Sequence, residues 1–158
     1  MAALIGRHIN RIDKKGRVSV PKQFRDVLSG QGFEGIYTFP SFKYPAVEGC
    51  GEEFIQRIIA SLDDLDLFSD EQDDLASTIL ENTHQLTYDT EGRIILPSAV
   101  LKHANINSEA IFVGRGKRFQ IWEPTAYELH SSHSFSRAKK KGVRGSTAPF
   151  WSSVPVQS

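Results

Sequence analysis

The residues best suited to chemistry occur in two similar segments of this 158-residue chain. Each segment has an aspartate, a glycine three residues later, an arginine directly after it and a proline four residues further on: Asp13, Gly16, Arg17 and Pro21, then Asp89, Gly92, Arg93 and Pro97. An arginine can bind a phosphate or a guanine edge through paired N–H donors, and a carboxylate can hold a turn or carry a proton. The recurrence predicts one structural unit used twice, with anion binding or acid–base chemistry as its options.

The two segments differ in charge between the aspartate and the glycine. Lys14 and Lys15 stand in the first segment where Thr90 and Glu91 stand in the second. The cations expected near the first tip are Arg7, Arg11, Lys14, Lys15 and Arg17, with Lys22 and Arg25 on the segment that follows. Such a density of like charge costs stability unless an anion is near. The pattern is compatible with a nucleic acid partner, but basic turns are often plain solvated loops, and charge alone favours that interpretation.

The two aspartates, Asp13 and Asp89, have two possible roles. Asp13 and Asp89 can each accept hydrogen bonds from backbone N–H groups two residues on, which fixes a turn when the glycine adopts a positive φ. As a pair on related lobes they could instead share a proton, as in aspartic proteases. That chemistry needs small neighbours, and Lys14 and Glu91 are bulky. The structural role is favoured, and Arg93 stays open between a DNA contact and a structural ion pair.

The formal net charge is zero, but the charges are segregated along the chain. Residues 1–30 and 131–158 each carry +5, residues 31–85 carry −10, and residues 86–130 are neutral. A neutral total therefore does not exclude a polyanionic partner. The single cysteine excludes an intrachain disulfide, and no apolar run reaches the ~20 residues that span a bilayer. We expect a cytoplasmic protein that is not embedded in a membrane.

Patterning predicts a first unit of strands and one short helix. A strand over 4–12, a turn over 13–16 and a strand over 17–20 are expected to form a hairpin, followed by a helix over 22–28 and a strand over 35–39. A charged β-hairpin can enter a DNA major groove, where lysines neutralise phosphates and an arginine contacts guanine, discriminating by roughly 1–3 kcal/mol.

The acidic middle of the chain predicts helices. Apolar residues at helical spacing indicate a helix over 52–62, and Ser69 with Gln72 matches a capping box that begins a second helix. Its acidic side chains form either a solvated face or a surface that meets basic residues of a neighbouring subunit or keeps phosphates away.

The first unit is then repeated. The expected elements are strands over 86–88 and 93–96, a helix over 97–104, a hairpin of 111–114 with 118–122, and a helix over 125–130. From Ser131 onward, serine and basic residues predict disorder. No set of His, Cys and carboxylate residues has metal-ligand spacing, so no metal, cofactor or catalytic residue is predicted.

With these residues in view, the Asp-x-x-Gly-Arg hairpin followed by a proline and a short helix resembles the SpoVT/AbrB-type module. Its tandem form resembles the MraZ family of bacterial transcriptional regulators, to which Phe24-Arg25, Phe112-Val113-Gly114 and Phe119-Gln120-Ile121-Trp122 are also similar. The resemblance implies a mainly β fold with short helices, in which two tandem swapped-hairpin modules form an intrachain pseudo-dimeric β-barrel. The expected domains are a first module over 3–50, an acidic helical connector over 51–84, a second module over 85–130 and a basic tail over 131–158.

The resemblance also implies a function: binding of double-stranded DNA at promoter direct repeats as a ring-shaped homo-oligomer, with repression of the division and cell-wall gene cluster. The implied DNA-binding residues are Arg7, Lys14, Lys15, Gly16, Arg17 and Arg93, with Asp13, Asp89 and Gly92 as structural turn residues. The implied location is the cytoplasm, at the nucleoid. The alternative is an antitoxin-like or scaffolding protein-interaction module.

Overall fold

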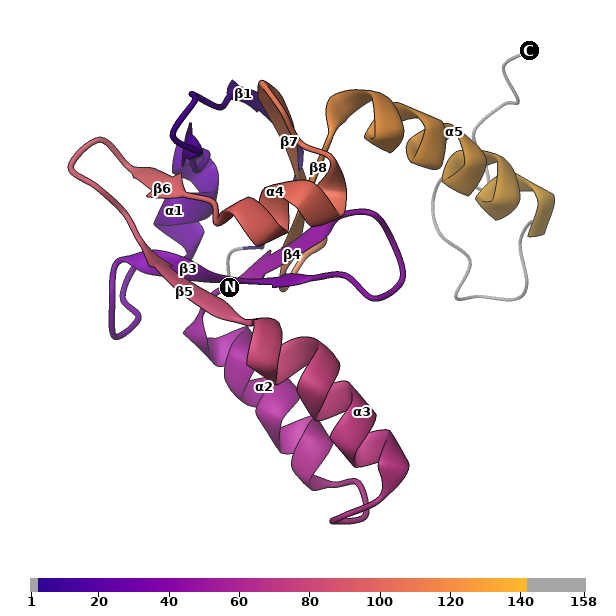
Figure 1. Ribbon diagram of the computed structural model, residues 1–158. Helices are drawn as coiled ribbons and strands as arrows, with labels where there is room; N and C mark the ends of the chain where they lie inside the picture. Colours follow the sequence, from indigo (N-terminus) through magenta and orange to yellow (C-terminus); the bar gives the residue numbers. More distant parts are fainter. Residues whose placement is uncertain (1–2, 142–158) are drawn as a thin grey trace. The chain divides into compact units, whose positions relative to one another are not determined.

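The computed structural model describes residues 3–141, which form β-strands with short helices (Figure 1). The mainly β prediction with short helices is confirmed. The described chain divides into two compact units, one ending at Pro124 and the other beginning at Thr125. All strands belong to the first unit, which therefore positions both of the Asp-x-x-Gly-Arg segments.

The strands of the first unit form two antiparallel sheets. A six-stranded sheet has the order β1 (Arg7–Arg11), β7 (Glu109–Gly114), β8 (Phe119–Trp122), β4 (Val47–Cys50), β3 (Gly35–Pro40) and β5 (His84–Thr87). A two-stranded sheet pairs β2 (Arg17–Ser19) with β6 (Arg93–Ile95). The hydrogen-bonded sheet of the described residues ends at β1 and β5, so the closed barrel is not confirmed.

The predicted hairpin between residues 4–12 and 17–20 is wrong. The first strand pairs with β7, in a register that runs from Arg7 opposite Val113 to Arg11 opposite Glu109. The second strand pairs with β6 instead. One backbone hydrogen bond, from Asp13 N–H to the Arg17 carbonyl at 3.1 Å, closes the turn, after which the two strands enter different sheets.

The same exchange occurs in the second repeat. Its first strand, β5, pairs with β3 of the first repeat, just as β1 pairs with β7 of the second. In the small sheet, the repeat-related residues Val18 and Ile94 lie opposite each other. On either side, Leu96 N–H donates to the Gly16 carbonyl at 2.9 Å and Val20 N–H donates to the Gly92 carbonyl at 3.2 Å. Each turn is thereby tied to the strand that follows the other turn.

The main core lies among these strands and two short helices. Helix α1 (Lys22–Val27) follows Pro21, and α4 (Ser98–Ala104) follows Pro97. They bury Phe24 and Val100, respectively. Other buried residues of this cluster are Val18, Val20, Ile94, Leu96, Phe112, Phe119 and Ile121. Burial of apolar surface at roughly 25 cal/mol per Å² is the main stabilising contribution, and it anchors the strands that leave each turn.

The acidic middle forms two helices that lie side by side (Figure 1). They are α2 (Glu52–Asp63) and α3 (Asp70–Ile79), followed by a short 3-10 turn, η1 (Leu80–Asn82). The Ser69 hydroxyl accepts a hydrogen bond from Gln72 N–H at 3.1 Å, so the predicted N-cap is confirmed. The helices pack on a second core cluster that includes Phe39, Cys50 and Ile55.

The helix α5 (Pro124–Lys141) belongs to the second unit from Thr125 onward. The predicted disorder is wrong for residues 131–141, because the helix continues through them. Contacts one turn apart support this polar segment: the Ser134 hydroxyl lies 3.3 Å from His130 Nε2, and Lys139 Nζ lies 5.0 Å from the centre of the Phe135 ring. The rest of the predicted tail, residues 142–158, lies outside the described residues.

Candidate nucleic-acid interface

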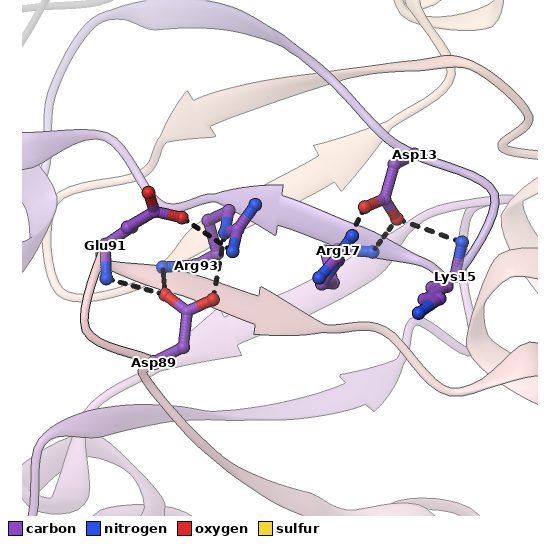
Figure 2. Close-up of polar contacts among 6 residues, drawn as sticks. All are labelled: Asp13, Lys15, Arg17, Asp89, Glu91 and Arg93. Atoms are coloured by element: carbon purple, nitrogen blue, oxygen red, sulfur yellow. Dashed lines mark hydrogen bonds and ion pairs between the residues drawn. The ribbon is translucent and has the colours of Figure 1, made fainter.

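The first turn is organised by one carboxylate (Figure 2). Oδ1 of Asp13 accepts hydrogen bonds from Lys15 N–H and Arg17 N–H, both at 2.9 Å. Gly16 N–H donates to the Asp13 carbonyl at 3.0 Å, with Gly16 at φ +83°. Since that backbone conformation favours glycine, the Asp-x-x-Gly spacing produces this turn directly.

The second turn has the same backbone arrangement. Oδ1 of Asp89 accepts from Glu91 N–H at 2.8 Å and from Arg93 N–H at 2.9 Å. Gly92, at φ +76°, donates its N–H to the Asp89 carbonyl at 3.1 Å. Both turns therefore hold an arginine at the same point, where the small sheet begins.

The two arginines differ in their side-chain partners. Arg17 Nε donates to Asp13 Oδ2 at 2.6 Å, and Arg93 Nε donates to Asp89 Oδ2 at 2.9 Å. Nη2 of Arg93 also lies 2.6 Å from Glu91 Oε2. Within residues 3–141, the Nη atoms of Arg17 have no such partner, because Lys15 stands where the second turn has Glu91. The first turn therefore leaves two guanidinium nitrogens available to a ligand.

Hydrogen bonding keeps the aspartates charged. The pKa of Asp13 is lowered, chiefly by the backbone hydrogen bond from Arg17, and that of Asp89 is lowered chiefly by the backbone hydrogen bond from Arg93. The side-chain hydrogen bond to Asp89 is the main cause of a raised pKa at Arg93. Each carboxylate is thus an ionised acceptor within its own turn, which is unlike the shared proton of an aspartic protease pair.

Each turn rests on the short helix of the other repeat. A Cβ atom at Gly16 would lie 2.9 Å from the Leu96 carbonyl oxygen and 3.7 Å from Leu101 of α4. A Cβ atom at Gly92 would lie 2.6 Å from the guanidinium carbon of Arg25 on α1. Arg25 Nε also donates to the Val20 carbonyl at 3.1 Å. Arg25 therefore lies against the second turn, an arrangement that the sequence did not indicate.

The remaining predicted cations are spread along β1 and α1. Lys14 and Lys15 are exposed on the first turn, and Arg11 is exposed where β1 approaches it. Arg7 is exposed at the opposite end of β1, about 13 Å away at 3.3 Å per residue. Lys22 pairs with Asp26 at 3.1 Å. The structure therefore brings Lys14, Lys15 and Arg17 together and separates Arg7 from them.

Residues 3–141 contain neither a candidate membrane span nor a candidate metal-binding cluster. No helix there has the length and apolar character needed to span a membrane. No group of three or more His, Cys, Asp or Glu side chains in that range could hold a metal ion. Cys50 is buried, and burial raises the pKa of its thiol to about 12.

Comparison with known proteins identifies relatives that cover most of the chain. The family model described as "MraZ protein, putative antitoxin-like" matches residues 79–143. The "Transcriptional regulator MraZ" of Pelagibacter ubique is 47% identical over 129 residues, which are 82% of this chain and 83% of that protein. The protein of the same name from Parvibaculum lavamentivorans is 48% identical over 128 residues, 80% of each chain. That from Rickettsia felis is 37% identical over 146 residues, 91% of this chain and 98% of its own.

Proposed function

Because the chain belongs to the MraZ family, whose relatives above are named transcriptional regulators, we propose that it regulates transcription by binding double-stranded DNA through its first turn. The observation that carries this proposal is the state of Arg17. Asp13 holds its Nε at 2.6 Å and leaves the Nη atoms for a ligand, beside the exposed Lys14 and Lys15. A guanidinium fixed in this way is ready for bidentate binding of a phosphate or of guanine O6 and N7.

The lysines and the arginine have different proposed roles. Lys14 and Lys15 neutralise phosphates, which sets affinity, and Arg17 contacts a base edge, which sets sequence preference. Gly16 is buried against Leu96, so its proposed part in DNA binding is to permit the turn that presents Lys14, Lys15 and Arg17. Arg7 and Arg93 complete the proposed contact set as secondary contacts. The paired strands β2 and β6 hold the two turns at opposite ends of one short antiparallel sheet.

The finer proposal concerns assembly and target. We propose a ring-like homo-oligomer that binds direct repeats in the promoter of the division and cell-wall gene cluster and represses it, acting at the nucleoid. Several subunits that engage several short repeats gain avidity without new contacts. The acidic exposed side chains of α2 and α3 would repel phosphates, so the basic first turn faces the DNA.

The test is a gel shift with labelled duplex DNA from upstream of the chain's own gene. Replacing Lys14, Lys15 and Arg17 by alanine is expected to abolish the shift and leave the thermal unfolding midpoint nearly unchanged, because these side chains are exposed or half-exposed. The matched control replaces Thr90, Glu91 and Arg93 by alanine and is expected to retain the shift. Equal losses from both triple variants would contradict a dominant first turn.

The salt dependence gives a second measurement of the same interface. If Z phosphates are contacted, the logarithm of the binding constant should fall with the logarithm of salt concentration at a slope of about −0.9Z. A slope near zero for the unaltered chain would contradict phosphate binding. It would favour the second candidate function, a protein-interaction module, which the antitoxin-like description of the matching family supports.

A further inference from the structure

Glu91 is the feature that most distinguishes the second turn from the first (Figure 2). Its Oε2 lies 2.6 Å from Nη2 of Arg93, and its side chain is 66% exposed. In both turns the aspartate already holds the arginine Nε, so only the Nη atoms remain for a ligand. In the second turn, Glu91 accepts one of the four Nη hydrogens and holds that side of the guanidinium.

We propose that Glu91 is a specificity-determining residue that tethers Arg93 and weakens its contact with DNA. Each chain then has one turn that binds DNA strongly and one that binds it weakly. This inference rests on the proposed function and assigns a role to a residue outside the proposed contacts. Bidentate recognition of guanine or phosphate uses two guanidinium N–H donors. Glu91 takes one N–H of Arg93 Nη2 and places a carboxylate beside the remaining Nη donors, which hinders a second anionic partner. Within residues 3–141, the Nη donors of Arg17 have no carboxylate partner of this kind.

The difference in charge between the two turns supports the same inference. Asp13, Lys14, Lys15 and Arg17 together carry +2, whereas Asp89, Glu91 and Arg93 together carry −1. The backbone hydrogen bonds of the two turns are alike, so this contrast comes from the side chains alone. The two repeats exchange equivalent strands, so the β2–β6 sheet has one turn at each end. The difference in side-chain charge makes one end basic and the other acidic. A chain with one basic end has a single preferred direction on a direct repeat.

The experiment compares Glu91→Gln with the unaltered full-length chain on the same upstream duplex. Glutamine keeps the size of the side chain and removes its charge. We expect binding about two- to fivefold tighter, the ratio that an exposed ion pair corresponds to. The salt slope should steepen by about 0.9 for each additional phosphate that is contacted. The control, Glu71→Gln on α3, removes an equal charge from an exposed site and should bind as the unaltered chain does.

A double variant separates tethering from plain repulsion of phosphates. If Glu91 acts through Arg93, then Glu91→Gln should have little effect when Arg93 is already alanine. If its full effect persists in the Arg93→Ala background, repulsion alone explains it and the proposal is overturned. The converse change tests the first turn: Lys15→Glu should weaken binding more than Lys15→Gln, because the new carboxylate can reach Arg17.

Two outcomes distinguish the failure of this inference from the failure of the proposed function. If Arg17→Ala abolishes the shift while Glu91→Gln binds as the unaltered chain does, only the inference is overturned. If the unaltered chain gives no salt-sensitive shift, or if Arg17→Ala binds normally, the proposed function fails and the inference fails with it. Thermal unfolding of each variant verifies that a change in binding does not reflect loss of the fold.

Discussion

At the scale of single residues, Asp13 and Asp89 each organise a turn with one carboxylate. Oδ1 accepts two backbone N–H groups and Oδ2 holds the arginine Nε. Hydrogen bonds of this kind stabilise the charged form of an acid. The aspartate therefore has a double role, because the same group that closes the turn also sets the direction of the guanidinium.

These aspartates predict a specific loss of stability in acid. The folded-state pKa of each lies below its ordinary value of 3.8, so the charged form is preferred in the native protein. This contribution to the free energy of unfolding is fully present above pH 3.8 and is lost as the pH falls through the lowered values. The Asp13→Asn, Asp89→Asn double variant should therefore lose less stability than the unaltered chain between about pH 5 and pH 2. Denaturant unfolding at a series of pH values measures the free energy of unfolding of both proteins. The same pH dependence in the double variant and the unaltered chain would contradict the prediction.

At the scale of elements, each turn is supported by the helix of the opposite repeat. Leu101 of α4 lies under Gly16, and Arg25 of α1 lies under Gly92. Leu101 and Arg25 occupy repeat-related positions, so the basic turn rests on an apolar side chain and the acidic turn rests on a cation. A cation beneath the second turn complements the charges of Asp89 and Glu91.

A pair of glycines tests how closely the first turn is packed. Gly16 and Gly30 both have positive φ, +83° and +88°, but a Cβ at Gly16 would lie 2.9 Å from a backbone oxygen, whereas a Cβ at Gly30 meets nothing within 4 Å. We expect Gly30→Ala to cost about 1 kcal/mol of stability through its backbone conformation alone. Gly16→Ala should cost about 2 kcal/mol or more, because the turn must also move away from Leu96. Chemical denaturation of both variants measures the difference. Equal losses of stability would show that the turn moves away from the Leu96 carbonyl without an energetic cost.

At the scale of the whole molecule, the exchange of strands makes the two repeats interdependent. Strands β1 and β2 find their partners in residues 109–114 and 93–95, and β5 finds its partner in residues 35–38. Neither repeat holds a complete sheet by itself, since the first strand of each is paired only with the other. Loss of one repeat would leave unpaired backbone groups along all four strands of the other.

Separate expression of the two repeats tests this interdependence. Residues 3–83 and 84–141, made as separate chains, should each lack cooperative unfolding, because each loses the partner strands of the other. Mixing them should restore a cooperative transition and the near-ultraviolet circular dichroism of the intact chain. A cooperative transition in either isolated piece would contradict the prediction.

The sequence predicted local features well and partner choice poorly. Ser69 and Gln72 identify the start of α3 because capping is a local interaction. Patterning alone did not identify the pairing of β1 with β7, because a strand's partner depends on residues about 100 positions away. An exchange of hairpins between the modules was implied only by the family resemblance. Strand β4 was not predicted because Gly49 interrupts the run of strand-forming residues. The structure gives the reason for this glycine: a Cβ atom there would lie 2.4 Å from the Phe119 ring. The tether between Glu91 and Arg93 depends on side-chain conformation, which residue spacing does not specify.

The pairing of β1 with β7 also affects how the chain is made. A ribosome completes Arg11 about 100 residues before it completes Gly114, the end of the partner strand. At about 5–20 residues per second, the newborn N-terminal strand waits roughly 5–20 s without hydrogen-bonding partners. During that interval the exposed Ile9 and its neighbours are open to misassembly or to a chaperone. The six-stranded sheet can therefore be completed only once nearly all of the first unit has been synthesised.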